Sequence, residues 1–385
     1  MLKIGAGAAI PAFRVMDVIA AANRRQAELP PGAPRILRME IGQPAAGAPA
    51  GACAVARAAL AGCDPLGYTE TLGLPDLRAR IAAHIQDWYG LAVPAARIAI
   101  TTGGSGAFPL AFLAAFNPGD RVALAAPYYP PYVNILLALG IRPVILPTTI
   151  DSRFQPTIAM LERLDPLPDG LIVASPSNPA GTMLHPDEFA ALARWCHAHG
   201  VRLISDEIYH GLTYETPGVS ATGFSDSAIV VNSFSKYFSM TGWRIGWMVL
   251  PEELVRPVER LAQNLSICAP HISQIVAAAC FDCHEELAGR VASYRAARDH
   301  LLAALPRAGF TRLSPAEGAF YIFADIADRG EASPDFCARM LRQAGIAATP
   351  GVDFDPERGN DFVRFSYCGP IGDVIEAGER LAGWR

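Results

Sequence analysis

A lysine and an arginine lie eight residues apart in the segment SFSKYFSMTGWRIGW, residues 233–247. Lys236 and Arg244 stand among aromatic and aliphatic residues, and the preceding run, residues 228–232, is apolar. Burying a cation without a partner is costly, so we expect both side chains to be buried around a bound group that is their partner. A lysine amine can form an imine with a carbonyl group, and a guanidinium can bind a phosphate through two parallel hydrogen bonds.

Three further segments carry polar groups that suit the same bound molecule. The glycines of TTGGSGAF, residues 101–108, expose backbone N–H groups at the start of a predicted helix, where a phosphate binds well. Asp206 suits a protonated ring nitrogen, while Asn178 and Tyr209 suit a ring hydroxyl. A phosphate, a pyridinium and an imine together describe pyridoxal phosphate. Each feature alone has a structural alternative: a tight turn for the glycines, a helix cap for Asp206, a turn before proline for Asn178, and a structural ion pair for Arg244.

The elements that must position these residues alternate along the chain. Short apolar runs predict buried strands, and helical patterns lie between many of them, which indicates a mostly parallel, doubly wound sheet. Ligands of such sheets bind beyond the carboxyl ends of the strands, which is where the four polar segments fall. The predicted strands are residues 97–102, 121–125, 143–147, 171–175, 201–205, 228–232 and 246–250.

The pattern changes after residue 252, where long helices are predicted over residues 252–263 and 271–304. Short strands over residues 318–325 and 362–366 and a final helix follow. We therefore predict an α/β fold with a mostly parallel seven-stranded sheet, helices on both of its faces, and a smaller α+β domain. The predicted division is an N-terminal segment joining the small domain (1–45), a large cofactor-binding domain (46–275) and a small C-terminal domain (276–385).

The composition argues against several classes of function. The 385-residue chain has a net charge of −5 and no runs of lysine and arginine, which disfavours binding to nucleic acid or to a membrane surface. It contains no long uncharged apolar stretch, and its start, MLKIGAGAAIPAF, shows no signal cleavage site, so we expect a cytoplasmic protein. The segment CFDCH, residues 280–284, matches the c-type haem pattern, but we interpret its cysteines as buried thiols on a helix. No metal site is predicted.

Together these segments resemble the aminotransferases of class I and II that use pyridoxal phosphate and have fold type I. The resemblance extends in order from residue 68 to residue 367, and the segment with the lysine and the arginine is its most specific part. The segments that carry it are YTETLGLPDLR (68–78), TTGGSGAF (101–108), APYYPPY (126–132), SPSNPAGT (175–182), SDEIYHGL (205–212), SFSKYFSMTGWRIGW (233–247) and FVRFSY (362–367).

The resemblance implies a role for each matching residue. Lys236 would carry the cofactor as an imine and act as the catalytic base, Asp206 would pair with the ring nitrogen, and Asn178 and Tyr209 would meet the ring oxygen. Tyr129 would stack on the ring, and Gly42, Asn178 and Arg364 would bind the substrate carboxylate. Tyr68 would reach the phosphate of a neighbouring subunit, which implies a homodimer. The residues implied around the cofactor phosphate are Ser105, Gly106, Ala107, Ser233, Ser235 and Arg244.

The activity implied is transfer of an amino group between an L-amino acid and a 2-oxo acid in two half-reactions at one site. An alternative on the same fold is a carbon–sulfur β-lyase, which releases pyruvate and ammonia without an acceptor. A regulator that borrows this domain is disfavoured because the motif region starts by about residue 40 and leaves no room for a DNA-binding domain ahead of it. A nucleotide-binding protein is disfavoured because TTGGSGAF is neither GxGxxG nor GxxxxGK[ST].

The expected substrate is a neutral amino acid, aliphatic or aromatic. Some relatives that prefer aspartate or glutamate carry a lysine in the matching loop, as GGKQA, whereas this chain has Ser105 and Gly106 there. A buried carboxylate without a cation is strongly disfavoured. Arg14 or Arg24 could still supply such a cation. The side chains expected around the substrate are apolar or aromatic: Phe13, Tyr129, Tyr132 and Phe320.

Overall fold

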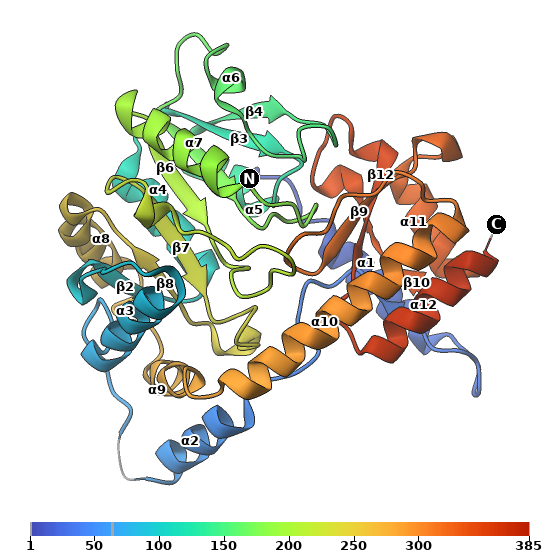
Figure 1. Ribbon diagram of the computed structural model, residues 1–385, viewed down its shortest axis with the longest axis horizontal. Coiled ribbons are helices and arrows are strands. Elements are labelled where there is room, and N and C mark those ends of the chain that lie inside the picture. The colour runs from blue at the N-terminus through green and yellow to red at the C-terminus, as the bar shows by residue number, and fades with distance from the viewer. Residues whose placement is uncertain (1, 63–64, 385) are drawn as a thin grey trace.

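The computed structural model describes residues 2–62 and 65–384, and its largest element is a seven-stranded sheet (Figure 1). The strands lie in the order β2-β8-β7-β6-β5-β3-β4. Strand β8 runs antiparallel to both of its neighbours, while the other neighbouring pairs are parallel, which confirms the predicted mostly parallel sheet. The strands are β2 Ile98–Thr101, β3 Arg121–Ala126, β4 Arg142–Pro147, β5 Gly170–Ala174, β6 Arg202–Asp206, β7 Ile229–Ser233 and β8 Gly246–Val249.

Helices cover both faces of this sheet because its central strands are apolar on both sides. Successive side chains of a strand point to opposite faces, so Ala99 and Ile100 join different hydrophobic clusters. One cluster also holds residues of α2 Ala50–Ala61, α3 Pro75–Tyr89, α7 Pro186–Ala198 and α9 His271–Cys280. The other holds residues of α4 Gly104–Ala115, α5 Pro131–Ala138 and α8 Glu252–Leu265.

A smaller antiparallel sheet lies beside the large one, in the order β11-β12-β9 (Figure 1). The long helix α10 extends from the neighbourhood of α9 toward this sheet, and a third hydrophobic cluster joins the small sheet to its helices (Figure 1). The predicted α+β part of the fold is thereby confirmed. Its elements are α10 His284–Ala304, β9 Tyr321–Asp325, α11 Ser333–Gln343, β10 Ile346–Ala347, β11 Thr349–Pro350, β12 Phe362–Ser366 and α12 Ile371–Gly383.

The N-terminal part of the chain returns to this smaller sheet. Helix α1 Val15–Ala27 is followed by β1 Leu37–Arg38, which pairs in parallel with β10. The backbone N–H of Ser366 donates to the carbonyl of Met39 at 2.8 Å, so residues 39–43 lie beside β12. One further short helix, α6 Ile158–Leu161, follows β4.

The single helix predicted over residues 271–304 is wrong, because the chain turns at residues 281–283 between α9 and α10. The turn buries Phe281 between Phe234 and Phe238, with ring centroids 5.5 and 5.2 Å away. It leaves Asp282 outside to accept a hydrogen bond of 2.9 Å from Arg80. Of the two cysteines expected to be buried, Cys280 is buried and Cys283 only partly so. Across residues 2–62 and 65–384, no helix combines the length and the apolar character needed to cross a membrane.

Candidate active site

A cavity of about 280 Å³ opens beyond the carboxyl ends of the strands of the large sheet. Most of the residues predicted for the site line it, and they come from both sheets and from the segment after β1. The predicted residues that line the cavity are Gly42, Ser105, Tyr129, Asn178, Asp206, Tyr209, Ser235, Lys236, Arg244 and Arg364.

Lys236 lies three residues beyond the end of β7 and points its amine into this cavity. Its Nζ donates to the carbonyl of Gly42 at 2.6 Å and lies 5.7 Å from the ring of Tyr209 and 5.8 Å from that of Phe320. Burial disfavours the ammonium form and lowers the pKa of Lys236 to about 8. At pH 7 roughly a tenth of such amines are neutral, which makes this lysine a far better nucleophile than one at the surface.

Asp206 is the last residue of β6 and is buried. It accepts hydrogen bonds from the hydroxyl of Tyr132 and, at 3.1 Å, from the backbone N–H of Ile208. Burial raises the pKa of Asp206 to about 6, although the hydrogen bond from Tyr132 opposes that rise. A buried carboxylate that lines the cavity suits a cationic ring nitrogen.

The start of α4 and the loop around Arg244 together form a cradle for an anion. Gly103 has φ +75°, and a Cβ there would lie 2.6 Å from Nη2 of Arg244. A Cβ on Gly246 would come within 3.0 Å of the backbone N of Gly104, so the two segments touch through glycines. The first N–H groups of a helix have no acceptor within the helix, and Gly104 and Ser105 line the cavity at this point.

Arg244 is more exposed than expected, and the prediction that it is buried is wrong. The residue has φ +51° and lines the cavity, and its Nη1 donates to the carbonyl of Thr241 at 2.9 Å. The guanidinium therefore donates to a backbone carbonyl and packs against the backbone of Gly103, and among the described residues it does not pair with a carboxylate.

Arg364, in β12, is a buried cation whose hydrogen-bond partners are all neutral. Its Nη1 donates to the Oδ1 of Asn178 at 2.8 Å, and its Nη2 donates to the carbonyl of Glu40 at 2.6 Å and to Oγ1 of Thr349 at 3.1 Å. Its Nε has no partner. Since a buried cation needs a counter-charge, this arrangement suits an incoming carboxylate.

Tyr209 and Tyr129 frame the space between these charged groups. The hydroxyl of Tyr209 shares a hydrogen bond of 2.9 Å with that of Tyr321, and a Cβ on Gly42 would lie 1.9 Å from the same Tyr321 oxygen. Position 42 must therefore be a glycine if Tyr321 is to keep this place. The ring of Tyr129 lies 5.8 Å from that of Phe13, and burial raises the pKa of Tyr129 to about 12, so its hydroxyl stays neutral.

Four of the residues predicted to hold the cofactor do not line the cavity, and neither does Phe320, which was expected around the substrate but is buried against Tyr209, with ring centroids 5.5 Å apart. Gly106 packs against Thr102, because a Cβ there would lie 2.2 Å from its Oγ1, and Ala107 is buried in the core. The Oγ of Ser233 is buried behind Ser235, to which it donates at 2.9 Å. Tyr68 is 82% exposed and lies away from the cavity of its own chain.

Several residues of the site were missed or misread in the sequence. Tyr132 was expected as part of an apolar wall, but its hydroxyl serves Asp206. Tyr321 and Ile41 were not singled out, nor were Val15 and Ile19 of α1, although all four line the cavity. Tyr321 follows Phe320 directly in a run of aromatic residues, where the pattern alone does not reveal which ring faces the site. Within the described part of the chain, no group of three or more His, Cys, Asp or Glu side chains could hold a metal ion.

Residues 35–381 match the family described as aminotransferase class I and II, so the chain belongs to this family, whose members use pyridoxal phosphate. The chain is 48% identical to the valine–pyruvate aminotransferase of Mycobacterium tuberculosis, over 99% of this chain and 98% of that protein. It superposes on an aminotransferase structure from Mycobacterium tuberculosis with a TM-score of 0.96 at 48% identity, covering 100% and 99% of the two chains. Thermus thermophilus aspartate aminotransferase with maleate gives a TM-score of 0.91 at 29% identity, with both chains fully covered. The protein is thus an aminotransferase acting on an amino acid and a 2-oxo acid, which confirms the predicted family, fold and activity.

Proposed function

We propose that this aminotransferase binds pyridoxal phosphate through Lys236 and takes neutral amino acids as donors. One observation carries the proposal: an amine whose pKa burial lowers to about 8 shares one cavity with the Asp206 carboxylate and the unpaired Arg364 cation. A nucleophilic amine, a carboxylate for a cationic ring and a cation for a carboxylate are the groups that transamination of an amino acid requires.

The cavity fits pyridoxal phosphate group by group. The start of α4, Ser235 and Arg244 would hold the phosphate, Asp206 the ring nitrogen, and Tyr129 one face of the ring. The close approach of Arg244 to Gly103 leaves this cradle no room for a side chain at position 103, as a backbone phosphate site requires. When bound, pyridoxal phosphate supplies an aldehyde that captures amines and a ring that withdraws electrons from the neighbouring carbon atom.

The residues of the chain direct the proton transfers. Lys236 Nζ would take the proton from Cα of the amino acid and would return it on the other side of the amino nitrogen, to the carbon atom that had been the cofactor's aldehyde carbon. Asp206, in its ionised form, holds a proton on the ring nitrogen. Arg364 fixes the substrate carboxylate, so that the Cα–H bond faces Lys236 and proton removal is favoured over loss of the carboxylate.

The walls of the cavity favour a neutral side chain. Phe13, Val15, Ile19 and Ile41 line it on the side of α1 and the segment after β1. Among the described lining residues, the cations are Lys236, Arg244 and Arg364, each with a place in the chemistry above. Arg14 and Arg24 line a different cavity, between α1 and α11. The name of the 48% identical relative supports valine as donor and pyruvate as acceptor.

We also propose a homodimer in which Tyr68 completes the site of the partner subunit. The exposed apolar side chains of Tyr68, Leu265 and Ile267 support this, because a monomer rarely leaves such groups together in water. Tyr68 and Ile267 lie close to one another, since the N–H of Thr69 donates to Sγ of Cys268 at 3.5 Å. Ile267 also has φ +64°, an unfavourable value for a β-branched residue that suits a place of contact.

Two measurements test the proposal. Borohydride reduction of the protein loaded with pyridoxal phosphate should fix the label on Lys236, and a label on another lysine would contradict the site. A single-turnover screen should show loss of the bound cofactor's absorbance with valine and leucine faster than with aspartate. Release of pyruvate and ammonia from cysteine conjugates without a 2-oxo acid would instead support the β-lyase.

A further inference from the structure

The loop that carries Asn178 is held at its base, around Thr182 and Met183, by side chains from other segments of the chain. Within the loop, the N–H of Ser177 donates to the carbonyl of Thr182 at 3.0 Å, and the N–H of Gly181 donates to the carbonyl of Ser177 at 2.9 Å. These bonds close residues 177–182 into a compact unit whose orientation depends on the groups around Thr182 and Met183. Asn178 follows Ser177 in this unit and lines the active-site cavity.

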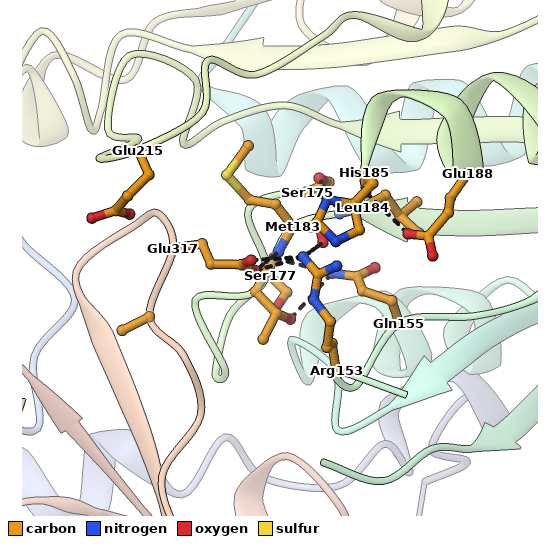
Figure 2. A network of polar contacts seen from close by, with 12 residues as sticks. Arg153, Gln155, Ser175, Ser177, Met183, Leu184, His185, Glu188, Glu215 and Glu317 are labelled. Carbon is orange, nitrogen blue, oxygen red and sulfur yellow. Dashed lines mark hydrogen bonds and ion pairs between the residues drawn. The ribbon is translucent and has the colours of Figure 1, made fainter. Parts of the chain in front are cut away.

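An ion pair satisfies both backbone groups of Met183 at that base. Oε2 of Glu317 accepts from the N–H of Met183 at 2.9 Å, and Nη2 of Arg153 donates to the carbonyl of Met183 at 2.6 Å. The same Nη2 lies 2.7 and 2.8 Å from the two carboxylate oxygens of Glu317. Figure 2 shows the two side chains reaching Met183 from opposite sides, Arg153 from the region after β4 and Glu317 from the segment before β9.

The two residues after Arg153 contact the same loop. Phe154 packs in a cluster with Ala180, Phe323 and Phe354. Gln155 is buried and donates through Nε2 to the carbonyl of Thr182 and to that of Ala174, both at 3.1 Å. Figure 2 shows Gln155 beside Arg153, on the same side of the loop.

The backbone that presents these side chains is strained. Arg153 and Phe154 have φ values of +56° and +54°, and two successive left-handed residues other than glycine are unfavourable. The Arg153–Glu317 pair is partly exposed, with about a quarter of each side chain in contact with water (24% and 27%), so it adds little to stability. Because the turn is strained and the ion pair that it presents is weak, the role of Arg153 and Glu317 points to positioning the loop rather than to stabilising the fold.

The position being fixed is that of Arg364. Asn178 accepts from Arg364 at 2.8 Å, and Phe323 and Phe354, which share a hydrophobic cluster with Phe154, also lie beside Arg364. Phe323 is paired with Arg364 across β9 and β12, and the guanidinium carbon lies 4.7 Å from the ring of Phe354. Residues 153–155 therefore contact both supports of the Arg364 guanidinium, the Asn178 loop and the aromatic cluster.

We propose that Arg153, Gln155 and Glu317 are positioning residues for the carboxylate subsite, holding the 177–183 loop so that Asn178 keeps Arg364 aimed into the cavity. This inference rests on the proposed function, in which Arg364 binds the substrate carboxylate. None of the three residues lines the active-site cavity, so each acts through the loop.

The test compares R153M, E317Q and the double variant, all loaded with pyridoxal phosphate. The matched control is E331Q, because Glu331 pairs with Arg339 at a similar exposure (28% and 29%) away from the site. Binding of acetate, 3-methylbutanoate and 2-methylpropylamine is followed by the absorbance of the bound cofactor. The first two probes carry a carboxylate without an amine, and the third carries the amine and the valine skeleton without a carboxylate.

We expect R153M and E317Q to weaken binding of both carboxylates about tenfold, with the amine and the E331Q control within about twofold of wild type. The double variant should lose no more than the worse single variant, because the two residues act as a unit. Carboxylate affinities within twofold of wild type in both single variants would overturn the proposal, as would equal losses for the amine and the carboxylates. If wild type binds acetate but not 3-methylbutanoate, the proposed pocket for a neutral side chain is contradicted. The variants can then still be compared through their affinity for acetate. Wild-type binding of neither would overturn the proposed function and this inference together.

Discussion

The hydrogen bond between Tyr132 and Asp206 should be measurable as an interaction that depends on the charge of Asp206. Y132F removes the hydroxyl and leaves the buried carboxylate with the N–H of Ile208 as its remaining hydrogen-bond donor. A hydrogen bond to a charged group contributes about 1.5–3 kcal/mol and one between neutral groups about 0.5–1.5, so the charge-dependent part is about 1 kcal/mol or more. Since about 1.4 kcal/mol corresponds to one pKa unit, the pKa of Asp206 should rise from about 6 by nearly one unit.

The assay is a double-mutant cycle on the cofactor-free protein, with D206N as the neutral counterpart of Asp206. Free energies of unfolding of wild type, Y132F, D206N and the double variant are measured in urea at pH 4 and pH 8. The coupling energy should be about 1 kcal/mol at pH 8, where Asp206 is ionised, and near zero at pH 4, where it is protonated. Tyr128, a buried neighbour that lies near Asp355 and Glu357, supplies the control Y128F, which should show no coupling to D206N. A coupling energy for Tyr132 that is the same at both pH values would refute the reasoning.

Four further outcomes are expected. Burial raises the pKa of Asp206 from 3.8 to about 6, so its ionisation costs folding stability as pH rises through that range. The free energy of unfolding of cofactor-free D206N, measured in urea, should therefore gain up to ~3 kcal/mol over that of wild type between pH 4 and pH 7. Capture of pyridoxal phosphate by the cofactor-free protein should accelerate with pH up to about 8, as Lys236 loses its proton; a rate that is flat from pH 6 to 9 would contradict the lowered pKa. R364M should raise KM for valine about a hundredfold or more, because a buried charge pair is lost, while 2-methylpropylamine binding stays unchanged. Hybrid dimers of Y68F and K236A subunits should be more active than either parent, since one intact site forms from Lys236 of one chain and Tyr68 of the other; activity no higher than that of the parents would count against a shared site.

The fold could be predicted from the sequence because its signals are local. Each strand of the large sheet is a short apolar run, and the residues that follow β5, β6 and β7 include Asn178, Tyr209 and Lys236. In a parallel sheet these strand ends must meet at one edge, so position along the chain fixes position in space. For this reason the cavity contains most of the residues that the motifs indicated.

The contacts that tune the site could not be predicted, because they join residues far apart in the sequence. Tyr132 and Asp206 are 74 positions apart, and Arg153 and Glu317 are 164 apart. An aromatic residue in an apolar run indicates a buried ring but not the direction of its hydroxyl. Arg244 is exposed and has a left-handed backbone conformation, and an arginine in the sequence gives no signal for either.

The separation of the site along the chain has a consequence for its order of assembly. Apart from Tyr68, the groups proposed to hold the cofactor lie between Gly103 and Arg244, and the large sheet is complete at Val249. Arg364 comes 115 positions later, on a strand of the other sheet. Because a chain leaves the ribosome N-terminus first, the cofactor half of the cavity can form while the substrate half does not yet exist. A chain cut short in this interval would keep a lysine able to capture aldehydes but have no guanidinium to select amino acids. Selectivity for the substrate carboxylate is therefore the last chemical property that synthesis adds to this enzyme.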